Sequence, residues 1–537
     1  MKKIFAVILC LAMLAFTFAA CTSAPPASST APPESAPAGT PSEETPVEPA
    51  PPSDLVEISW WLHGSNVSDD AAVMEQVNAY LAGYGFKLKP IWGTWGDFDT
   101  NVVLAINGGD PVDIYFTCSW SADEYNAFAK KGAFARLDDP DDNLLEQYAQ
   151  DIWSILPETL KSGAAVNGDA GYGVYALPGF KDYAVQNCWD VNVDRLTELG
   201  FTLDDVKKGF DSFGDIFAAA KEKYGNDFYP FLIEGAVLER MVTNTIIVTG
   251  DAGSNNLLSY YLDPTDVSKA VTGKLVNKFA TPEYEAFVTK VNEYYKAGYI
   301  DPAMANTSQA NDARTAHQTA GTYLIGTQSY SFGYEVQASA ERGIEVAMVP
   351  TTEAYVDTTG SQGAMMAISS ASAHKADTMK FLNLVNTDPK LMTLIAYGIE
   401  GVHYNLNADG NVEFVTEERN KYTPWRNGLG NVTILPPQQG EADLAPGQDF
   451  WTVFKDYYAS AKAIPALGWA LDQTPVADEI GALANVAAEY ALTLSTGAAE
   501  DPAASLAEFR QKLTDNGIDK VVEEANAQLE AFLAAKG

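Results

Sequence analysis

Histidine and basic residues are scarce in this chain of 537 residues, and each scarcity excludes a class of protein. Lysine and arginine total 34 against 71 aspartates and glutamates, which gives a formal net charge of -37. Nucleic acids and anionic lipid surfaces both need a basic face, so this balance excludes them as partners. None of the four histidines has a neighbour at metal-ligand spacing, which argues against a zinc hydrolase and leaves no metal site to predict; they are His63, His317, His374 and His403.

Cysteine is also rare, and four residues of this type do not make a disulfide scaffold. Cys10 lies in an apolar stretch near the N-terminus and Cys21 follows that stretch, which leaves Cys118 and Cys188 for the rest of the chain. These two thiols could pair in an oxidising compartment or stay apart in the interior. After the N-terminal stretch, no apolar segment reaches the roughly 20 residues that span a bilayer.

The N-terminus has the pattern of a bacterial lipoprotein signal. Lys2-Lys3 precede the apolar residues 4–18, and Ala19-Ala20-Cys21 forms a cleavage site of small residues before a cysteine. We therefore expect residues 1–20 to be removed and Cys21 to carry acyl chains that hold the protein on the outer face of the cell membrane. Phe18 stands where such signals most often have leucine, and a plain secretory signal or an uncleaved anchor are the alternatives.

The composition of residues 21–53 predicts a tether. The stretch from Thr22 to Ser53 has no aromatic residue and consists almost entirely of Pro, Ala, Ser, Thr and Glu. Such a composition buries nothing and favours extended polyproline conformations. At about 3.1 Å per residue, the tether would reach on the order of 100 Å when extended.

The chain after Ser53 has the pattern of an α/β protein. Apolar periodicity predicts strands over residues 54–62, 86–92 and 111–116, with helices over 71–80 and 98–106 between them. The second helix should end at Asn107-Gly108-Gly109, because glycine accepts the left-handed turn that follows a helix. Strand, helix, strand, helix, strand with short connections predicts a parallel sheet covered by helices.

Several segments resemble one known family. Asn107-Gly108-Gly109-Asp110-Pro111 running into Val112-Asp113-Ile114 resembles a helix-then-strand segment of family 1 extracellular solute-binding proteins, the capture subunits of bacterial ABC importers. Residues 397–404, with the sequence YGIEGVHY, are similar to a segment of the LipO/LplA-like lipoproteins of Firmicutes. The C-terminal part resembles that subgroup as well, in Leu467-Gly468-Trp469, Thr474-Pro475-Val476, the helical stretch around residues 487–490, and residues 513–519.

The resemblance implies a two-lobed α/β fold of the type II periplasmic-binding-protein kind, with a hinge and an interlobe cleft. We expect the chain to cross between lobes near Ala176-Leu177-Pro178, at residues 364–368, and around residues 463–469, where a few residues would absorb the hinge rotation. The expected segments are 54–178 for the first part of lobe 1, 179–365 for the first part of lobe 2, 366–465 for the second part of lobe 1, and 466–537 for a helical segment completing lobe 2.

The same resemblance implies that the protein, as a monomer without a cofactor, captures a small-molecule solute and presents it to ABC permease subunits in the membrane. We expect the solute to be an oligosaccharide. Sugars present apolar C–H faces and a rim of hydroxyls. A binding site for them therefore needs flat aromatic side chains together with planar hydrogen-bond donors and acceptors. The candidate ligand-binding residues are Trp61, His63, Trp92, Trp95, Trp120, Asp182, Tyr183, Glu400, His403, Tyr404, Trp425 and Arg426.

Each of these residues has a structural alternative. Any single tryptophan could pack in the core, and for Trp60, next to Trp61 on the first strand, the core is the better interpretation. Arg426 could form a salt bridge that holds its loop, and His403 could be a hydrogen-bonded core histidine. Clefts of open sheets form at the ends of parallel strands, where His63 and several of the tryptophans are expected.

Enzyme motifs are weak. Ser372-Ala373-His374-Lys375 matches the spacing of a β-lactamase-type nucleophile, but the polar first turn of a helix is the simpler interpretation. Residues 405–410 begin like a calcium loop, yet Thr416 stands where the bidentate glutamate should be, and Asp409-Gly410 more simply forms a hairpin turn. Glycoside hydrolysis needs only two carboxylates in a cleft and stays open as an alternative function. A sensing lipoprotein without transport is the other alternative.

Overall fold

The computed structural model describes residues 55–246, 257–442 and 444–536. The predicted signal of residues 1–20, the lipidated Cys21 and the tether of residues 21–53 lie outside the described residues. Among the helices of the described ranges, none is both long and apolar enough to cross a membrane.

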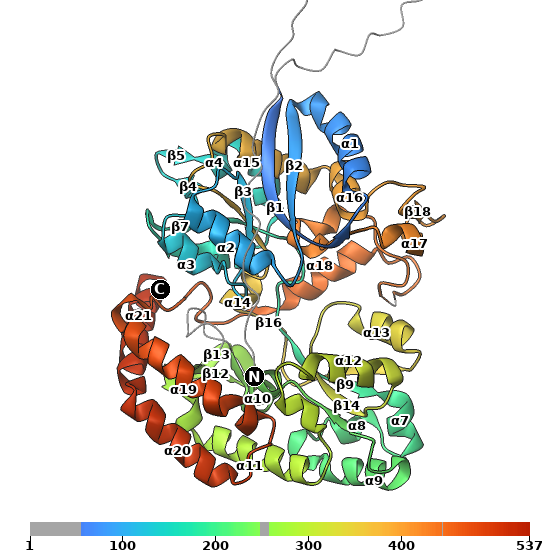
Figure 1. Ribbon diagram of the computed structural model, residues 1–537, viewed down its shortest axis with the longest axis vertical. Coiled ribbons are helices and arrows are strands. Elements are labelled where there is room, and N and C mark those ends of the chain that lie inside the picture. Colours follow the sequence, from blue (N-terminus) through green and yellow to red (C-terminus); the bar gives the residue numbers. More distant parts are fainter. Residues whose placement is uncertain (1–54, 247–256, 443, 537) are drawn as a thin grey trace, which may run out of the picture. The chain divides into compact units, whose positions relative to one another are not determined.

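The first sheet contains the strands predicted at the start of the folded chain. Its order is β2 (Phe86–Gly93), β1 (Val56–Val67), β3 (Ile114–Thr117), β17 (Met365–Ile368) and β8 (Leu177–Pro178). Strand β1 runs parallel to β2 and to β3, and helices α1 (Asp70–Leu81) and α2 (Phe98–Gly108) make the connections. The predicted alternation of strands and helices is therefore confirmed, and it forms the blue part of Figure 1 (Figure 1). We call this sheet and its covering helices lobe 1.

Alternation along β1 decides which side chains enter which layer of lobe 1. Ile58, Trp60 and Leu62 are at most 1% exposed, and the Trp60 ring meets Phe381 of α15 (Lys375–Thr387) edge-on at 6.1 Å. Trp60 is therefore a core residue, as predicted. Trp61 points to the opposite face, where its ring meets Phe98 of α2 at 5.9 Å.

Asp113, in the family-like segment before β3, joins three elements of lobe 1. Its carboxylate accepts hydrogen bonds from the backbone N–H and the hydroxyl of Ser59 on β1, at 2.9 and 2.8 Å. It also accepts one from the hydroxyl of Ser372 at 2.6 Å. Ser372 therefore belongs to the polar turn before α15, in agreement with the structural interpretation of residues 372–375.

The second sheet has the order β10 (Phe231–Leu232), β14 (Ile325–Ser329), β9 (Asn187–Asn192) and β15 (Val346–Pro350). Every residue of β9 is buried, including Asp190, whose carboxylate accepts hydrogen bonds from Arg342 of α13 (Tyr334–Arg342) at 2.8 and 3.1 Å. We call this sheet and its helices lobe 2. Cys188 on β9 and Cys118 after β3 are both buried free thiols.

The C-terminal helices pack on lobe 2. Helices α19 (Ala477–Ser495), α20 (Pro502–Asp515) and α21 (Ile518–Lys536) contact α10 (Gly235–Thr243), α11 (Pro282–Lys296) and the hairpin of β12 (Leu258–Asp263) and β13 (Asp266–Asn277). Asn292 of α11 donates to the carbonyls of Gly497 and Ala499, both at 2.7 Å. Figure 1 shows these red helices beside the green ones of lobe 2 (Figure 1).

The chain passes between the two sheets in three connections. The first lies between β8 and β9, and the second between β15 and β17. In the third, β21 (Lys462–Ala463) after α18 (Phe450–Ser460) pairs in parallel with β16 (Tyr355–Val356) and leads toward α19. The lobe boundaries set from the sequence stay predictions.

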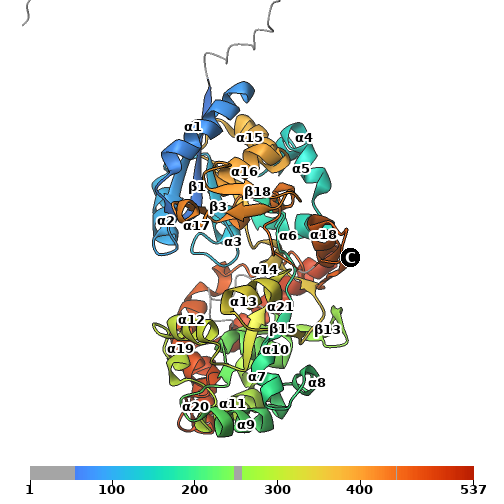
Figure 2. The same cartoon turned by 90° about the vertical axis from the view of Figure 1, so that its right-hand side faces the viewer.

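The outer part of lobe 1 is formed by residues after β17. Helix α16 (Pro389–Tyr397) is followed by a hairpin of β18 (Tyr404–Leu406) and β19 (Val412–Phe414), whose turn contains Asp409 and Gly410 as predicted. The hairpin lies beside α16 in both views (Figures 1 and 2). Strand β20 (Tyr422–Pro424) then pairs antiparallel with the end of β1.

The remaining described strands are β4 (Asp138–Asp139), β5 (Asp142–Asn143), β6 (Ala165–Gly168), β7 (Gly171–Val174) and β11 (Thr245–Ile246). The remaining described α-helices are α3 (Tyr125–Lys130), α4 (Leu144–Tyr148), α5 (Gln150–Ile155), α6 (Glu158–Ala164), α7 (Val193–Glu198), α8 (Leu203–Val206), α9 (Gly214–Tyr224), α12 (Ala310–Ala320), α14 (Thr358–Ser361) and α17 (Thr416–Arg419).

Candidate functional site

Six aromatic side chains meet in lobe 1 where β1, β2 and β3 end, and we call them the tryptophan cluster. They come from β1, the loop after β2, the start of α2, β3, the loop after β3, and the turn after β20, and they are His63, Trp95, Phe98, Phe116, Trp120 and Trp425. Trp425 reaches the cluster because β20 pairs with β1, and its backbone N–H donates to the carbonyl of His63 at 2.9 Å.

The rings of the cluster form a layered stack. The imidazole of His63 lies between the rings of Phe98 and Trp95, with centroid distances of 3.7 and 4.3 Å and near-parallel planes. The Trp95 ring also meets Trp425 at 5.1 Å and Trp120 at 6.1 Å. Phe98 and Phe116 are each 1% exposed, whereas Trp95 is 53% and Trp120 is 49% exposed. The cluster thus has a buried floor and an exposed rim of two indoles.

The rim is held in place by the surrounding backbone. The indole N–H of Trp120 donates to the carbonyl of Gly363 at 2.8 Å, so the ring orientation is fixed although half of its surface is exposed. Asp97 accepts from the backbone N–H and the hydroxyl of Thr94, both at 2.7 Å, and so closes the turn that carries Trp95.

Two glycines leave room for rings of the cluster. A Cβ at Gly93 would lie 2.8 Å from the Phe98 ring. A Cβ at Gly428 would lie 2.7 Å from the Trp425 ring and 3.5 Å from Phe116. Any larger residue at either position would therefore displace an aromatic side chain.

His63 is the polar member of the buried floor. It is 4% exposed, and neither of its ring nitrogens has a hydrogen-bond partner among the described residues. Burial lowers its pKa from the ordinary value of 6.5 to about 4, so the ring is neutral at physiological pH.

Asp123 supports the loop that carries Trp120. Its carboxylate is completely buried and accepts a hydrogen bond from the Ser121 hydroxyl, and burial raises its pKa to about 7. The backbone carbonyl of the same residue accepts from the Thr117 hydroxyl at 2.5 Å. These contacts make Asp123 a residue that positions the loop, and its burial keeps the carboxyl group away from solvent.

Two of the tryptophans predicted as ligand-binding lie outside the cluster. Trp92 donates its indole N–H to Asp70 at 2.8 Å and meets Tyr422 edge-on at 6.2 Å. Trp61 is partly buried under α2, with its indole nitrogen unpartnered among the described residues. Both side chains contribute packing to lobe 1.

The polar residues predicted around the 397–404 segment form a structural network. His403 is fully buried and its Nδ1 accepts from the backbone N–H of Ile399 at 2.9 Å, while Tyr404 packs on Tyr397. Glu400 lies exposed on the same turn. Arg426 donates to the hydroxyl of Tyr397 at 3.1 Å and forms an ion pair with Glu441, so it makes the salt bridge that is the structural alternative for this residue.

Asp182 and Tyr183 lie at the first connection between the sheets. Asp182 pairs with Lys181 at 2.8 Å, and Tyr183 is 2% exposed and packs on Tyr458. Burial raises the pKa of Tyr183 to about 12. The structure thus gathers His63, Trp95, Trp120 and Trp425. Of the other predicted residues, Glu400 is exposed and the rest lie outside the cluster and make structural contacts.

Phe98 and Phe116 belong to the cluster although they were not among the predicted ligand-binding residues. The sequence holds a signal for each, since Phe98 opens the helix three residues after Trp95 and Phe116 lies in the buried strand before Trp120. Ring contacts with His63, at 3.7 and 5.1 Å, place both in the floor.

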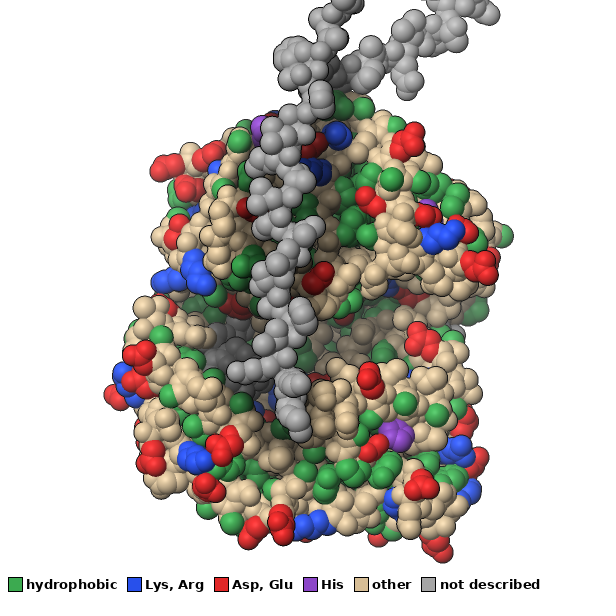
Figure 3. All heavy atoms as spheres, in the orientation of Figure 1, with side chains coloured by type: hydrophobic (Ala, Val, Ile, Leu, Met, Phe, Trp, Pro, Cys, Tyr) green, Lys and Arg blue, Asp and Glu red, His purple; other side chains and the backbone are tan. Residues whose placement is uncertain are grey.

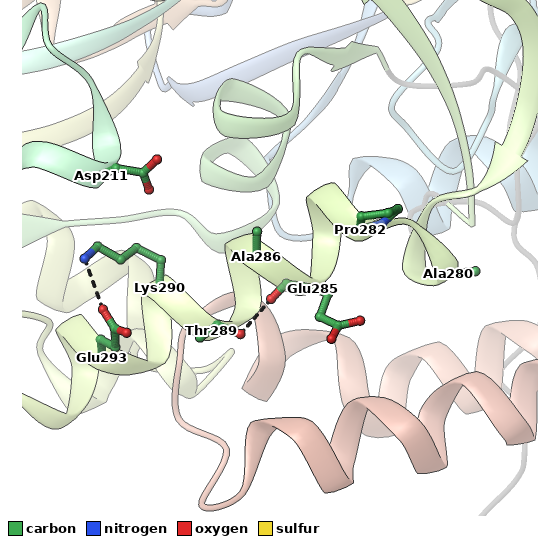
Figure 4. Close-up of a pocket in the computed structure, with 8 residues that line it drawn as sticks. All are labelled: Asp211, Ala280, Pro282, Glu285, Ala286, Thr289, Lys290 and Glu293. Atoms are coloured by element: carbon green, nitrogen blue, oxygen red, sulfur yellow. Dashed lines mark hydrogen bonds and ion pairs between the residues drawn. The ribbon is translucent and has the colours of Figure 1, made fainter.

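Other candidate sites are weaker. Within the described ranges, no three His, Cys, Asp or Glu side chains group as metal ligands. A shallow depression follows α11 and is lined by Asp211, Ala280, Pro282, Glu285, Ala286, Thr289, Lys290 and Glu293 (Figure 4). Lys290 is already paired with Glu293 at 3.0 Å, and the depression has no aromatic lining residue. It lies in lobe 2, whereas the tryptophan cluster lies in lobe 1.

Comparison with known proteins finds one family model and several similar proteins. Residues 465–534 match a family model described as Domain of unknown function (DUF3502). Over 455 residues the chain is 25% identical to a carbohydrate ABC transporter substrate-binding protein of Streptococcus pneumoniae, covering 84% of this chain and 86% of that protein.

Solved structures agree in fold. The N-glycan transport solute-binding protein NgtS of Streptococcus pneumoniae superposes with a TM-score of 0.74 at 23% identity, over 90% of this chain and all (100%) of that one. Its complex with Man1GlcNAc superposes with a TM-score of 0.67 at 23% identity, over 89% and 99% of the two chains. The alginate-binding protein AlgQ2 follows with a TM-score of 0.59 at 16% identity, over 89% and 99%. The chain therefore has the two-lobed α/β fold of solute-binding proteins, as predicted.

Proposed function

We propose that this protein is the solute-binding subunit of a carbohydrate ABC importer, and that it captures an oligosaccharide on the tryptophan cluster. The observation that carries the proposal is the pair of half-exposed indoles, Trp95 and Trp120, which stand over a buried aromatic floor. Water-exposed aromatic surface is costly unless a ligand covers it. The apolar C–H face of a sugar ring is a suitable cover, since aromatic side chains with a few polar groups are typical of ligand sites.

The charges near the cluster favour an uncharged sugar. Two cations lie close to the cluster: Arg426, which follows Trp425 in the sequence and is paired with Glu441, and Lys181, which lies by Gly363 and is paired with Asp182. Neither is left free to bind a carboxylate or sulfate group. On the face drawn in Figure 3, acidic and basic side chains are scattered rather than gathered into one patch (Figure 3).

The named relatives support the same substrate class. The pneumococcal relative is named as a carbohydrate transporter component, and NgtS has been solved with Man1GlcNAc and with Man5GlcNAc. From these names we propose that the solute is an oligosaccharide.

The mechanism is a population shift. An oligosaccharide that contacts both lobes in the interlobe cleft stabilises the closed form by its greater affinity for that form, and no catalytic step is needed. We further propose that the protein acts as a monomer lipid-anchored through Cys21, belongs with the LipO/LplA-like lipoproteins, and hands its solute to permease subunits at the membrane.

A thermal-shift screen tests the proposal. The protein is melted alone and with Man1GlcNAc, Man5GlcNAc, kestose, alginate oligomers, amino acids and short peptides. The proposal expects a rise in Tm with at least one uncharged oligosaccharide and none with the amino acids and peptides. A rise with a peptide and with no sugar would reject the assignment.

Glycoside hydrolysis is the enzymatic alternative, and one assay separates it from binding. The oligosaccharide that raises Tm is incubated with the protein, and newly formed reducing ends are measured over time. We expect no release above the protein-free control. Release that depends on the protein, and that is abolished by changing a carboxylate near the cluster, would make the chain a hydrolase.

A further inference from the structure

Lobe 2 carries three polar side chains at the carboxyl ends of its two parallel strands. Strands β10 and β14 pair in parallel, with Leu232 opposite Gly326. Glu234 follows β10, and Gln328 is the second-last residue of β14. Arg314 of α12 joins them, because its guanidinium donates to the Glu234 carboxylate and to the side-chain oxygen of Gln328, each at 3.1 Å. We call Glu234, Arg314 and Gln328 the polar trio.

The polar trio lies at the edge of the lobe 2 sheet where the chain passes to and from lobe 1. Strand β14 runs antiparallel to β9, and Gln328 stands opposite Cys188 near the start of β9. The first connection enters β9 at this edge, and the second leaves it from the end of β15, where Pro350 also stands opposite Cys188. Just beyond the trio, the Tyr330 ring meets Tyr457 of α18 at 5.4 Å. The carboxyl ends of parallel strands form the ligand side of open α/β sheets, and in lobe 2 this side is the one next to the connections.

The backbone fixes the polar trio while part of it stays open to solvent. The N–H of Glu234 donates to the Thr327 hydroxyl at 2.9 Å, and Arg314 donates to the Thr327 carbonyl at 2.8 Å. The side chain of Arg314 is 19% exposed and that of Glu234 is 55% exposed. Among the described residues, Oε2 of Glu234 accepts from Arg314 and Oε1 accepts no hydrogen bond. The trio therefore holds an exposed acceptor in a fixed place.

Stability alone does not explain this arrangement, and an oligosaccharide site needs it. An ion pair with one exposed partner contributes little to stability, because water screens the charges. Stacking on Trp95 and Trp120 uses the C–H face of a sugar and leaves its hydroxyl groups for polar side chains. No aromatic side chain among the described residues between 187 and 350 is exposed, so lobe 2 offers no second stacking surface there. Its contribution to binding a sugar must be polar.

We propose that Glu234, Arg314 and Gln328 form the lobe 2 half of the sugar site and bind hydroxyl groups of the oligosaccharide that stacks on the tryptophan cluster. This inference rests on the proposed function. A carboxylate, a guanidinium and an amide are planar groups, and together they supply the acceptors and donors that neighbouring hydroxyls need. The positive charge of Arg314 is matched by the negative charge of Glu234. The trio is therefore neutral as a whole, which suits an uncharged sugar.

The test compares two carboxylates of lobe 2 by calorimetric titration of the full chain with the uncharged oligosaccharide that gives the largest thermal shift. Glu234→Ala removes the exposed acceptor of the trio. Glu285→Ala is the matched control: Glu285 is 61% exposed, and its partner Arg510 also donates to backbone carbonyls, but the pair joins α11 to α20. We expect Glu234→Ala to weaken binding at least tenfold and Glu285→Ala to leave affinity within twofold of the wild type, with similarly small changes in Tm.

A second variant separates a lost hydrogen bond from a freed charge. Gln328→Ala removes the amide and leaves the ion pair of Arg314 with Glu234 in place. We expect it to weaken binding at least threefold. Affinity within twofold of the wild type in either Glu234→Ala or Gln328→Ala overturns this inference, and the proposed function still stands if Trp120→Ala weakens binding in the same series. A wild-type protein that binds none of the oligosaccharides overturns both.

Discussion

Single residues of the tryptophan cluster show a conflict between stability and binding. Leaving a buried polar group without a partner costs about 1 to 3 kcal/mol, and His63 has two such nitrogens. Stacking against Phe98 and Trp95 offsets part of this, since aromatic pairs contribute about 0.5 to 1.5 kcal/mol beyond their burial. The remaining cost is of the kind that functional sites retain at the expense of stability.

The protonation of His63 gives a pH-dependent prediction about stability. Its pKa is about 4 in the folded chain against an ordinary 6.5, because aromatic rings bury it and disfavour its charged form. Between these values the unfolded chain binds a proton that the folded chain does not, so stability falls as pH falls through 6.5 toward 4. At about pH 4.5 this contribution reaches roughly 2 to 3 kcal/mol.

Denaturant melts of wild type and His63→Phe at pH 7 and at about pH 4.5 measure this contribution. The stability difference between the two proteins should shift in favour of the variant at the lower pH by the amount given above. A difference that is the same at both pH values would mean that His63 titrates normally and is more exposed than the structure shows.

For some tryptophans the sequence predicts whether the side chain is in the core or in the cluster, and for others it does not. Trp60 and Trp61 are distinguished by strand alternation, and Trp60 is buried as predicted. Trp92 and Trp95 follow each other too closely for any pattern to show that one bonds Asp70 while the other forms the rim. Trp425 joins the cluster through the pairing of β20 with β1, a contact between distant parts of the chain that no local pattern encodes.

Helices and strands can be predicted from the sequence more accurately than the contacts of single side chains. The strands and helices from β1 to β3 were predicted because alternation, apolar periodicity and the glycine after α2 all agree, and Gly109 has a φ of 69°. Strand β9 carried no such signal, since its buried residues include Asn187, Asp190 and Asn192. Their burial depends on partners elsewhere in the chain, such as Arg342.

Helix α19 contains a glycine that the fold does not require. Gly481 lies near the start of α19 on the exposed side, and a Cβ built there meets nothing within 4 Å. Alanine removes backbone freedom from the unfolded chain, so Gly481→Ala should stabilise the protein by about 0.5 to 1 kcal/mol. A denaturant melt checks this, and a loss of stability would mean that the helix surface is covered.

Gly428, in the turn after β20, is a glycine whose replacement by alanine we expect to be harmful. Gly428→Ala would place a Cβ 2.7 Å from the Trp425 ring, which must then shift within the cluster. We expect a measurable loss of oligosaccharide affinity by calorimetry, with Gly481→Ala as a control that binds normally. Unchanged affinity for Gly428→Ala would show that the position of Trp425 does not matter for binding.

At the scale of the whole molecule, the N-terminal segment and the folded body have separate roles. The predicted anchor depends on Cys21, whereas the tryptophan cluster lies entirely in lobe 1. Cys21→Ala should therefore release the protein into the medium or leave its signal uncleaved, without altering the fold. Fractionation of cells followed by mass spectrometry measures this. Continued cleavage after residue 20 with acyl-chain membrane attachment would contradict the lipoprotein prediction.

The most direct test of the account is a calorimetric titration of an oligosaccharide into wild type, Trp120→Ala and Trp92→Ala. Trp120 is half-exposed in the rim and Trp92 is bonded to Asp70 outside the cluster. Removing the Trp120 plate should cost about 1 to 3 kcal/mol of binding, roughly tenfold to a hundredfold, with a smaller effect on unfolding. Trp92→Ala should lower stability by about 3 kcal/mol or more and leave affinity near that of wild type. Unchanged affinity in Trp120→Ala, together with a large loss of stability, would contradict the claim that the cluster binds the sugar.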